Sequence, residues 1–462
     1  MKVKPSISQP TLLAIAWPIF VEQTLRILIG TVDTFMVSHV SDGAVAALGV
    51  ANQFVVLALI CFNFIGIGAS VVITHHVGAG DYAGAKKIVG TAIGVNFWVG
   101  LVCSAIAYFF AAPLLRIMQL PPELMEYALP FLALMGGSLF MEALNGAIGA
   151  SLRAYGHTRD AMVVTLFQNV INIAGSCVLL FGLFGAPKMG VTGVALASVA
   201  SRVAASIALW VLLERRLKLR LRLKDLVEFN LERIKRILHI GLPAAGEHMS
   251  YWLSLMVITS FVARLGGESL AQLTYTQNVQ RLVILFSIAL GLGTEILIGR
   301  LIGAGEFEQA YIEVKKSLRT GLMIATGAVV IVAIFAPQLL GLFSHDPVII
   351  AGGTLLLRMS VVYEPGRVFN IVIINSLRAT GDARFPVQVA MVSQWFFGVP
   401  FAWFLSLKMH WGLPGVWIAM MTEEWVRGLI MHRRWVNRSW LKYAHRSREQ
   451  VTSNLIPVVP ES

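Results

Sequence analysis

Long apolar stretches recur along the whole chain, separated by short polar segments. Twelve of them are each long enough for an α-helix to cross a bilayer, which takes about 20 residues. They cover residues 11–37, 45–74, 85–111, 125–150, 160–184, 190–213, 236–263, 268–299, 311–342, 348–376, 385–406 and 412–431. The pattern predicts an all-α polytopic membrane protein with twelve transmembrane helices.

The second half of the chain repeats the first at a constant offset of 225 residues. The coinciding positions include Pro18 with Pro243, Glu22 with Glu247, "SLRAYG" (151–156) with "SLRATG" (376–381), and "GAGDYAGA" (78–85) with "GAGEFEQA" (303–310). Because each repeat holds six helices, an even number, both repeats have the same orientation in the membrane. This predicts two six-helix lobes related by a pseudo-twofold axis along the membrane normal, an architecture found in secondary transporters.

One strong change in composition divides the two repeats. The stretch "LERRLKLRLRLKDLVEFNLERIKR" begins at residue 213 and is rich in Lys and Arg. It predicts an N-lobe over 1–212, a basic cytoplasmic linker over 213–235 at the lipid headgroups, and a C-lobe over 236–437. Residues 438–462 are expected to form a mostly disordered cytoplasmic tail.

The net charge of +12 is explained by topology rather than by a nucleic-acid partner. Of the 37 Lys and Arg residues, 27 lie on the side of the N-terminus and 4 on the opposite side. Cytoplasmic loops carry such an excess, so both termini are expected in the cytoplasm of a multi-pass protein of the cell membrane. The three cysteines show no disulfide or metal spacing.

No motif for catalysis or ATP binding appears in the sequence. H-E-x-x-H, Walker A and G-x-S-x-G are all missing. We therefore expect no enzyme activity and no cofactor, so uphill transport draws on an ion gradient or on a separate subunit.

Several segments resemble the MATE (multidrug and toxic compound extrusion) family, nearest to the branch with DNA-damage-inducible-type members. They are "PIFVEQTLRILIGTVDTFMVSHVSDGAVAALGVANQF" (18–54), the "GAG" after the second and eighth spans, "GVTGVALAS" (190–198) and "SLRATGD" (376–382). The resemblance covers essentially the whole chain. It implies two lobes arranged as a V and cation-coupled export of drugs.

The resemblance also implies a cation or proton site in the N-lobe. It matches the family's first-helix carboxylate to Asp33, its span-5 amide to Asn172 and a span-6 hydroxyl to Ser198. Ser176 stands where some members have a second acid. In the C-lobe, Glu247 resembles an acid used by other members, whereas Arg367 stands where those members have an acid in span 10.

Charged residues within the spans are candidate functional residues, because an ionised carboxylate in hydrocarbon costs at least ~2.5–3.5 kcal/mol. Glu22, Arg26 and Asp33 lie within about 40° of one another on a helix. The i,i+4 spacing of Glu22 and Arg26 predicts an ion pair. Asp33 has no basic residue one turn away, so we expect it to face a wet cavity, to hold a proton, or to bind Na⁺ transiently, without a permanent metal.

Further residues are expected to line the substrate cavity or to serve secondary coupling. They are Glu22, Arg26, Glu247, Tyr251, Trp252, Glu364, Arg367 and Asn370, with Pro18 and Pro243 as candidate hinges. Tyr251 and Trp252 beside Glu247 suit an organic cation through cation–π contact, and Glu364 and Arg367 are spaced for an ion pair. Glu295, Glu423, Glu424 and Arg427 lie near predicted helix ends, which predicts interfacial positions.

The favoured hypothesis is a monomeric antiporter that exports organic cations in exchange for H⁺ or Na⁺, in contact only with its substrate and the bilayer. The alternative is a flippase for a lipid-linked precursor, for which a strongly cationic cavity would be expected. A sugar porter of the major facilitator type lacks support, because the loop after the second span reads "GAGDYAGAKK". A membrane-embedded enzyme or sensor is disfavoured by the absence of motifs and by the repeat.

Overall fold

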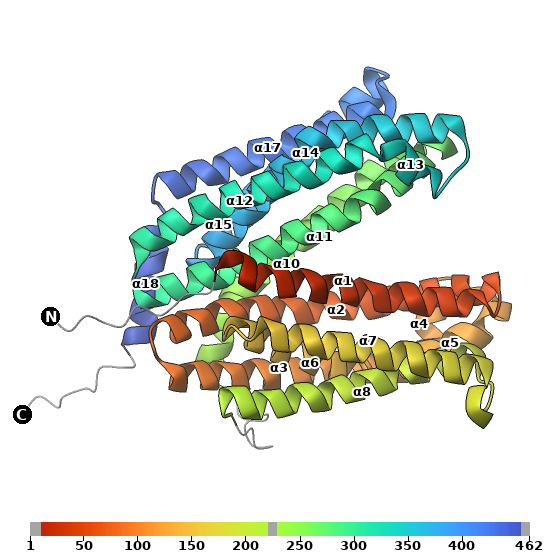
Figure 1. Ribbon diagram of the computed structural model, residues 1–462, viewed down its shortest axis with the longest axis horizontal. Coiled ribbons are helices and arrows are strands. Elements are labelled where there is room, and N and C mark those ends of the chain that lie inside the picture. The colour runs from red at the N-terminus through yellow and green to blue at the C-terminus, as the bar shows by residue number, and fades with distance from the viewer. Residues whose placement is uncertain (1–10, 220–228, 454–462) are drawn as a thin grey trace, which may run out of the picture. The chain divides into compact units, whose positions relative to one another are not determined.

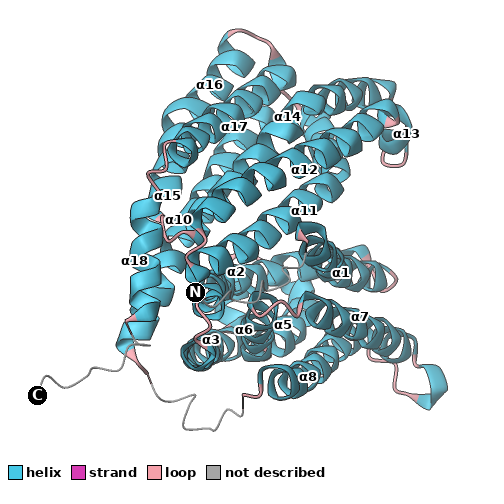
Figure 2. Cartoon of the chain, turned by 60° about the vertical axis from the view of Figure 1, so that its left-hand side comes forward, coloured by secondary structure: helices cyan, strands magenta, loops and turns pink. Residues whose placement is uncertain are grey.

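The computed structural model describes residues 11–219 and 229–453. The centre of the predicted linker and the end of the predicted tail lie outside these ranges. Every regular element within them is a helix, as the cartoon in Figure 2 shows. The predicted all-α class is therefore confirmed.

The first repeat forms α1 to α8, drawn from red to yellow-green in Figure 1. The helices are α1 Leu12–Ser38, α2 Asp42–Gly78, α3 Tyr82–Phe109, α4 Ala111–Ile117, α5 Pro122–Gly137, α6 Leu139–Ala154, α7 Thr158–Phe181 and α8 Gly190–Leu217, with a 3-10 turn at Leu183–Gly185. Polar caps set two of the starts. Ser41 Oγ accepts from the Ala44 amide at 3.0 Å and Asp81 Oδ1 from the Gly84 amide at 2.8 Å.

The second repeat forms α10 to α17, followed by one more helix, α18. The elements are α10 Leu231–Ala263, α11 Gly267–Ala304, α12 Phe307–Ile334, α13 Ala336–Gly341, α14 Pro347–Ala379, α15 Arg384–Val392, η2 Ser393–Gly398, α16 Val399–Trp403, η3 Phe404–Lys408, α17 Gly412–Val436 and α18 Leu441–Thr452. The two η segments are π-helical. Packing repeats as well: α6 contacts both α2 and α3, and α14 contacts both α11 and α12.

The described helices account for twelve spans. Nine are long and apolar enough to cross a membrane, and the bent pair α5–α6 makes a tenth. The helices α10 and α17, with 33 and 25 residues, are long enough but carry more charged side chains. These findings fit the predicted twelve-helix membrane protein with two six-helix repeats.

The predicted fourth span is not a single straight helix. It breaks at Ser138, where α5 and α6 meet at 42°. Arg202 of α8 stabilises the break, because its Nη1 donates to the Met135 carbonyl at 3.0 Å and to Ser138 Oγ at 2.7 Å. A backbone carbonyl freed inside a membrane needs such a partner.

By its contacts, the chain divides into two compact units, and the boundaries between them fall inside three helices. The C-unit joins the residues up to Val21 to Glu247–His445, and the N-unit joins Glu22–Gly246 to the residues from Arg446 onward. The chain thus passes between units within α1, within α10 and within α18, and the first two passages lie 225 residues apart. The predicted lobe boundaries, which follow the covalent repeat, stay a prediction.

Small residues allow α1 and α10 to pack closely against their neighbours. In the N-unit, a Cβ on Gly68 of α2 would lie 2.1 Å from the Ile237 carbonyl oxygen of α10, and one on Gly241 would lie 2.3 Å from the Phe64 carbonyl oxygen. In the C-unit, a Cβ on Gly293 of α11, the repeat counterpart of Gly68, would lie 3.3 Å from the Cβ of Ala16. Small residues of this kind let membrane helices approach to backbone contact.

The prediction of a mostly disordered tail is wrong for residues 441–452, which form α18. Trp440, just before this helix, is buried and stacks on Trp435 of α17 with ring centroids 4.5 Å apart. The ring of His445 lies 4.5 Å from that of Phe307 of α12. A 12-residue helix is marginal by itself, so these tertiary contacts are what stabilise it.

Candidate functional site

Asp33 is the centre of a compact hydrogen-bonded group in the N-unit. Its side chain is buried on α1, with 5% of the residue exposed. Asn172 Nδ2 donates to Asp33 Oδ1 at 3.1 Å, and Ser198 Oγ donates to Asp33 Oδ2 at 2.9 Å. Asn172 Nδ2 also donates to Ser198 Oγ at 2.8 Å. The packing of α7 on α8 places the amide and the hydroxyl side by side, so Asp33 is bound at both oxygens.

Ser176 lies one turn after Asn172 but does not join this group. It is completely buried, and its Oγ has no hydrogen-bond partner among the described residues. The Oδ1 of Asn172 is also without a partner there. In the described ranges no three His, Cys, Asp or Glu side chains come together as a metal site. The group around Asp33 therefore offers one carboxylate and several neutral oxygens.

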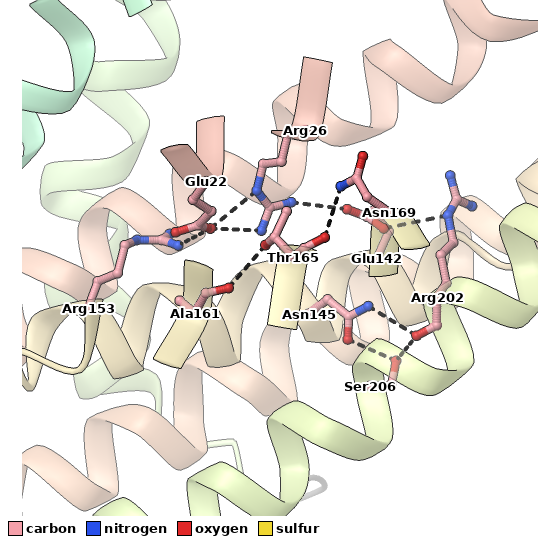
Figure 3. A network of polar contacts seen from close by, with 10 residues as sticks. All are labelled: Glu22, Arg26, Glu142, Asn145, Arg153, Ala161, Thr165, Asn169, Arg202 and Ser206. Atoms are coloured by element: carbon pink, nitrogen blue, oxygen red, sulfur yellow. Dashed lines mark hydrogen bonds and ion pairs between the residues drawn. The ribbon is translucent and has the colours of Figure 1, made fainter. Parts of the chain in front are cut away.

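A second polar network begins at Glu22, eleven residues before Asp33 (Figure 3). Glu22 Oε1 accepts from Arg153 Nη1 at 2.7 Å and from Arg26 Nη2 at 3.1 Å. The ion pair expected from the spacing of Glu22 and Arg26 is thus confirmed. Arg153, however, makes the shorter contact, although it lies beyond the predicted fourth span, 125–150. Because α6 continues to Ala154, Arg153 lies on the helix and reaches Glu22.

Glu142 extends this network toward Asp33. Its Oε1 lies 3.4 Å from Arg26 Nη1, and its Oε2 lies 3.5 Å from Arg202 Nε. The network therefore contains three guanidinium groups and two carboxylates, an excess of one positive charge. Arg202 is close enough to Asp33 to interact with it electrostatically. An ionised Asp33 therefore has a compensating charge nearby, although it has no direct ion-pair partner among the described residues.

The C-unit repeats one of these ion pairs. Glu247 Oε2 lies 3.1 Å from Arg378 Nη2, and these residues are the repeat counterparts of Glu22 and Arg153. Arg378 Nη1 also lies 3.6 Å from Glu295 Oε2. The expected interfacial position of Glu295 stays a prediction, but its side chain is only 1% exposed. The reason is that α11 and α14 pack tightly along their length and enclose its side chain.

The other expected pair of the C-unit, Glu364 and Arg367, is present at 2.8 Å. Asn370 does not join it, because its Nδ2 donates instead to Glu424 Oε2 at 2.6 Å. Glu424 lies on α17 beside Glu423, and both carboxylates pair with Arg427 at 2.8 and 3.1 Å.

The interfacial positions expected for three residues of α17 also stay a prediction, although protein encloses their side chains. Glu423, Glu424 and Arg427 are all buried, 4–6% exposed. They lie against α14 and η2, which cover this face of α17. Position along the sequence alone gave no sign of this cover.

Tyr251 and Trp252 point to different surroundings. Tyr251 lines a small cavity together with Glu423 and Glu424, whereas Trp252 is 56% exposed. The expected aromatic pair around Glu247 is therefore split in the structure. Pro18 and Pro243 both lie inside unbroken helices, α1 and α10, three residues before the chain passes from one unit to the other.

Comparisons with known proteins agree with one another. A model of the family described as MatE matches residues 18–178 and 243–404. The chain is 43% identical over 439 residues to the "Uncharacterized transporter YisQ" of Bacillus subtilis (strain 168), covering 95% of this chain and 96% of that protein. It is 26% identical over 442 residues to the "Probable multidrug resistance protein NorM" of Thermotoga maritima, covering 95% of both.

Solved structures show the same fold. The chain superposes with a TM-score of 0.85 and 21% identity on a structure described as "Crystal structure of MATE in the bent conformation", covering 94% of this chain and 96% of that one. A second, described as "Outward-facing conformation of a multidrug resistance MATE family transporter of the MOP superfamily", gives a TM-score of 0.81 at 21% identity and covers 96% and 95%.

Proposed function

Because the chain belongs to the MatE family, we propose that it is a secondary active antiporter that exports organic cations in exchange for protons. The observation that carries this proposal is the geometry of Asp33. It is a buried carboxylate whose two oxygens are held by neutral donors, Asn172 and Ser198, rather than by a cation. Multidrug resistance is what the name of the Thermotoga relative states, and we extend it to this chain as part of the proposal.

The mechanism requires Asp33 to alternate between two states. Ionised, it attracts an organic cation or another cation into the N-unit, with Asn172 and Ser198 orienting its oxygens. Protonated, it loses that attraction. A site that cannot hold both cations well at once couples their movements in opposite directions.

The donor set favours a proton over sodium as the coupling ion. Sodium would need Asp33 together with neutral oxygens of Asn172, Ser198 and Ser176. The Ser176 Oγ lies one turn along α7 and has no hydrogen-bond partner in the part of the chain that the structure describes. The second acid that some members have is replaced by Ser176, so the site offers a single negative charge. A proton needs only one carboxylate oxygen, with Ser198 Oγ as its hydrogen-bond partner.

The proposal also covers the oligomeric state, the topology and the cofactors of the protein. The protein acts as a monomer in the cell membrane, both termini are cytoplasmic, and no cofactor other than the coupling ion takes part. We propose that α1 bends at Pro18 when it moves, because proline leaves one carbonyl of the helix without its usual hydrogen-bond partner.

Dye efflux from energised inverted vesicles tests the function. Inverted vesicles that contain the wild-type protein should accumulate ethidium. Collapse of the proton gradient should stop the accumulation, whereas collapse of the sodium gradient should not. Asp33→Asn mimics the protonated form and should reduce transport to background at an unchanged protein level. The matched control, Asp42→Asn at an exposed position of α2, should transport normally. Wild-type transport by Asp33→Asn would refute the role of Asp33.

A further inference from the structure

The C-unit contains a buried charged cluster whose three carboxylates have no acidic counterpart at the repeat positions of the N-unit. It consists of Glu364 and Arg367 on α14 with Glu423, Glu424 and Arg427 on α17, and all five residues are at most 7% exposed. Tyr363 lines one small cavity with Glu423 and Glu424, and Arg367 lies 4.2 Å over its ring, so the five residues form one group. Three carboxylates face two guanidiniums, so the cluster carries one excess negative charge when every group is ionised.

An uncompensated buried charge is costly, and a carboxylate in this position usually takes up a proton or a cation instead. The network around Glu22 has the opposite balance, an excess of one positive charge beside Asp33. The C-unit cluster instead lacks one positive charge, which a proton or another cation from outside the cluster would supply.

A cavity adjoins the cluster at the carboxylates of α17. It has a volume of about 30 Å³ and is lined by Tyr251, Tyr363, Gln394, Gly398, Glu423 and Glu424, among others. A single water needs ~10–15 Å³ by this kind of measure, so the cavity has room for one or two waters but not for a drug. Gln394 is 4% exposed, and its Nε2 has no hydrogen-bond partner among the described residues. A water in the cavity would satisfy it.

The backbone around the cavity is shaped for Glu423. Ser393 and Gln394 begin the π-helical segment η2, and such segments occur often at functional sites. Gly398 closes the same segment, and a Cβ there would lie 3.1 Å from the Cγ of Glu423. A side chain at position 398 would therefore crowd the glutamate.

Hydrogen bonds distinguish the two neighbouring carboxylates. Glu424 accepts from the Asn370 amide at 2.6 Å and lies 2.8 Å from Arg427 Nη2. Arg427 also contacts both oxygens of Glu423, Oε1 at 3.1 Å and Oε2 at 3.2 Å. Glu423 Oε1 in addition meets the hydroxyl of Ser393 at 2.6 Å. A hydroxyl can donate or accept, and Ser393 Oγ has a second acceptor in the Ala390 carbonyl at 3.2 Å. When Glu423 is protonated, it can donate to Ser393 while Ser393 donates to Ala390.

We propose that Glu423 is a second proton-exchange site, loaded and unloaded through water in the cavity between α10, α14, η2 and α17. The proton passes between a cavity water and a carboxylate oxygen of Glu423, while Asn370 and Arg427 bind Glu424. This site deepens the proposed antiport, because it adds a titrating group in the C-unit to Asp33 in the N-unit.

Infrared spectroscopy of the purified full-length protein in lipid vesicles tests the site without reference to transport. A protonated glutamic acid has a carbonyl stretch separate from the bands of carboxylates and of the backbone. Because a protonated Asp33 absorbs in the same region, the spectra are compared in the Asp33→Asn background. There the band should be present and should disappear on alkaline titration, and Glu423→Gln should lack it. The control Glu268→Gln, at an exposed position of α11, should keep it. An Asp33→Asn background without the band, or Glu423→Gln with it unchanged, would overturn the proposal.

Two further variants determine which carboxylate holds the proton. Ser393→Ala removes the hydroxyl beside Glu423 and should shift the frequency of the band. Asn370→Ala removes the partner of Glu424 and should leave the frequency unchanged. The opposite pattern would place the proton on Glu424, and loss of the band on adding Na⁺ at constant pH would make this a sodium site. Either result would refute the assignment.

A transport measurement then separates exchange from a static proton. In proteoliposomes, the protons exchanged per tetraphenylphosphonium ion should fall by one in Glu423→Gln relative to the wild type. An unchanged ratio would show that the proton on Glu423 is structural. If the wild type moves no tetraphenylphosphonium, the proposed function is refuted. The infrared result for Glu423 does not depend on transport and still decides whether Glu423 holds a proton.

Discussion

The repeated ion pairs of the two units should differ in their contribution to stability, although they occupy equivalent positions. Glu22 is 1% exposed and is the single ion-pair partner of Arg153 among the described residues. Replacing it by Gln leaves Arg153 unpaired and takes one of two carboxylates from Arg26. Removing one partner of a buried ion pair costs ~3–5 kcal/mol. Because Arg26 is 31% exposed and keeps Glu142, we expect about 3 kcal/mol for Glu22→Gln.

Glu247→Gln is the matched variant in the C-unit. Its partner Arg378 keeps Glu295 at 3.6 Å and donates to Asn375 Oδ1 at 3.2 Å. The guanidinium is therefore still compensated, and the loss is one charged hydrogen bond, ~1.5 kcal/mol. The difference of about 1.5 kcal/mol between the variants corresponds to roughly a tenfold change in the unfolding equilibrium.

Unfolding of the purified protein by sodium dodecyl sulfate in mixed micelles, followed by tryptophan fluorescence, gives both values. The double variant Glu22→Gln/Arg153→Gln should recover part of the loss, because no guanidinium is then left unpaired. The reasoning fails if Glu247→Gln is as destabilising as Glu22→Gln, or if the double variant loses the sum of its two single losses.

Two other predictions follow from the packing and the charge distribution. Gly68→Ala should destabilise the protein by about 1–3 kcal/mol, because its Cβ would meet the Ile237 carbonyl. Gly49→Ala in the same helix has open space around its Cβ and should stabilise the protein by up to ~1 kcal/mol. Thermal unfolding compares the two variants, and equal effects would contradict the close contact at Gly68. Cysteines at Ser41 or His345 should react with an impermeant thiol reagent in intact cells and one at Asn454 should not, because 27 of 37 basic residues lie on the side of the termini; reaction at Asn454 would reverse the topology.

The sequence by itself determined the class of the protein and its internal repeat. Helices are the elements that satisfy every backbone group within a single segment, so apolar stretches of sufficient length specify them without reference to the rest of the chain. Local spacing was also sufficient for the pairs Glu22–Arg26 and Glu364–Arg367, because residues three and four apart on a helix are neighbours in any fold.

Tertiary structure alone decided which residues far apart in the sequence share a charge. Arg153 reaches Glu22 across 131 positions, and the burial of Glu423 depends on how α14 and η2 cover α17. Asn172 and Ser198 were matched to Asp33 through a family resemblance, and only the packing of α7 on α8 shows that both bind it. The physical reason is that an ion pair or hydrogen bond forms over about 3 Å, and such distances between helices are set by side-chain packing, on which apolar periodicity carries no information.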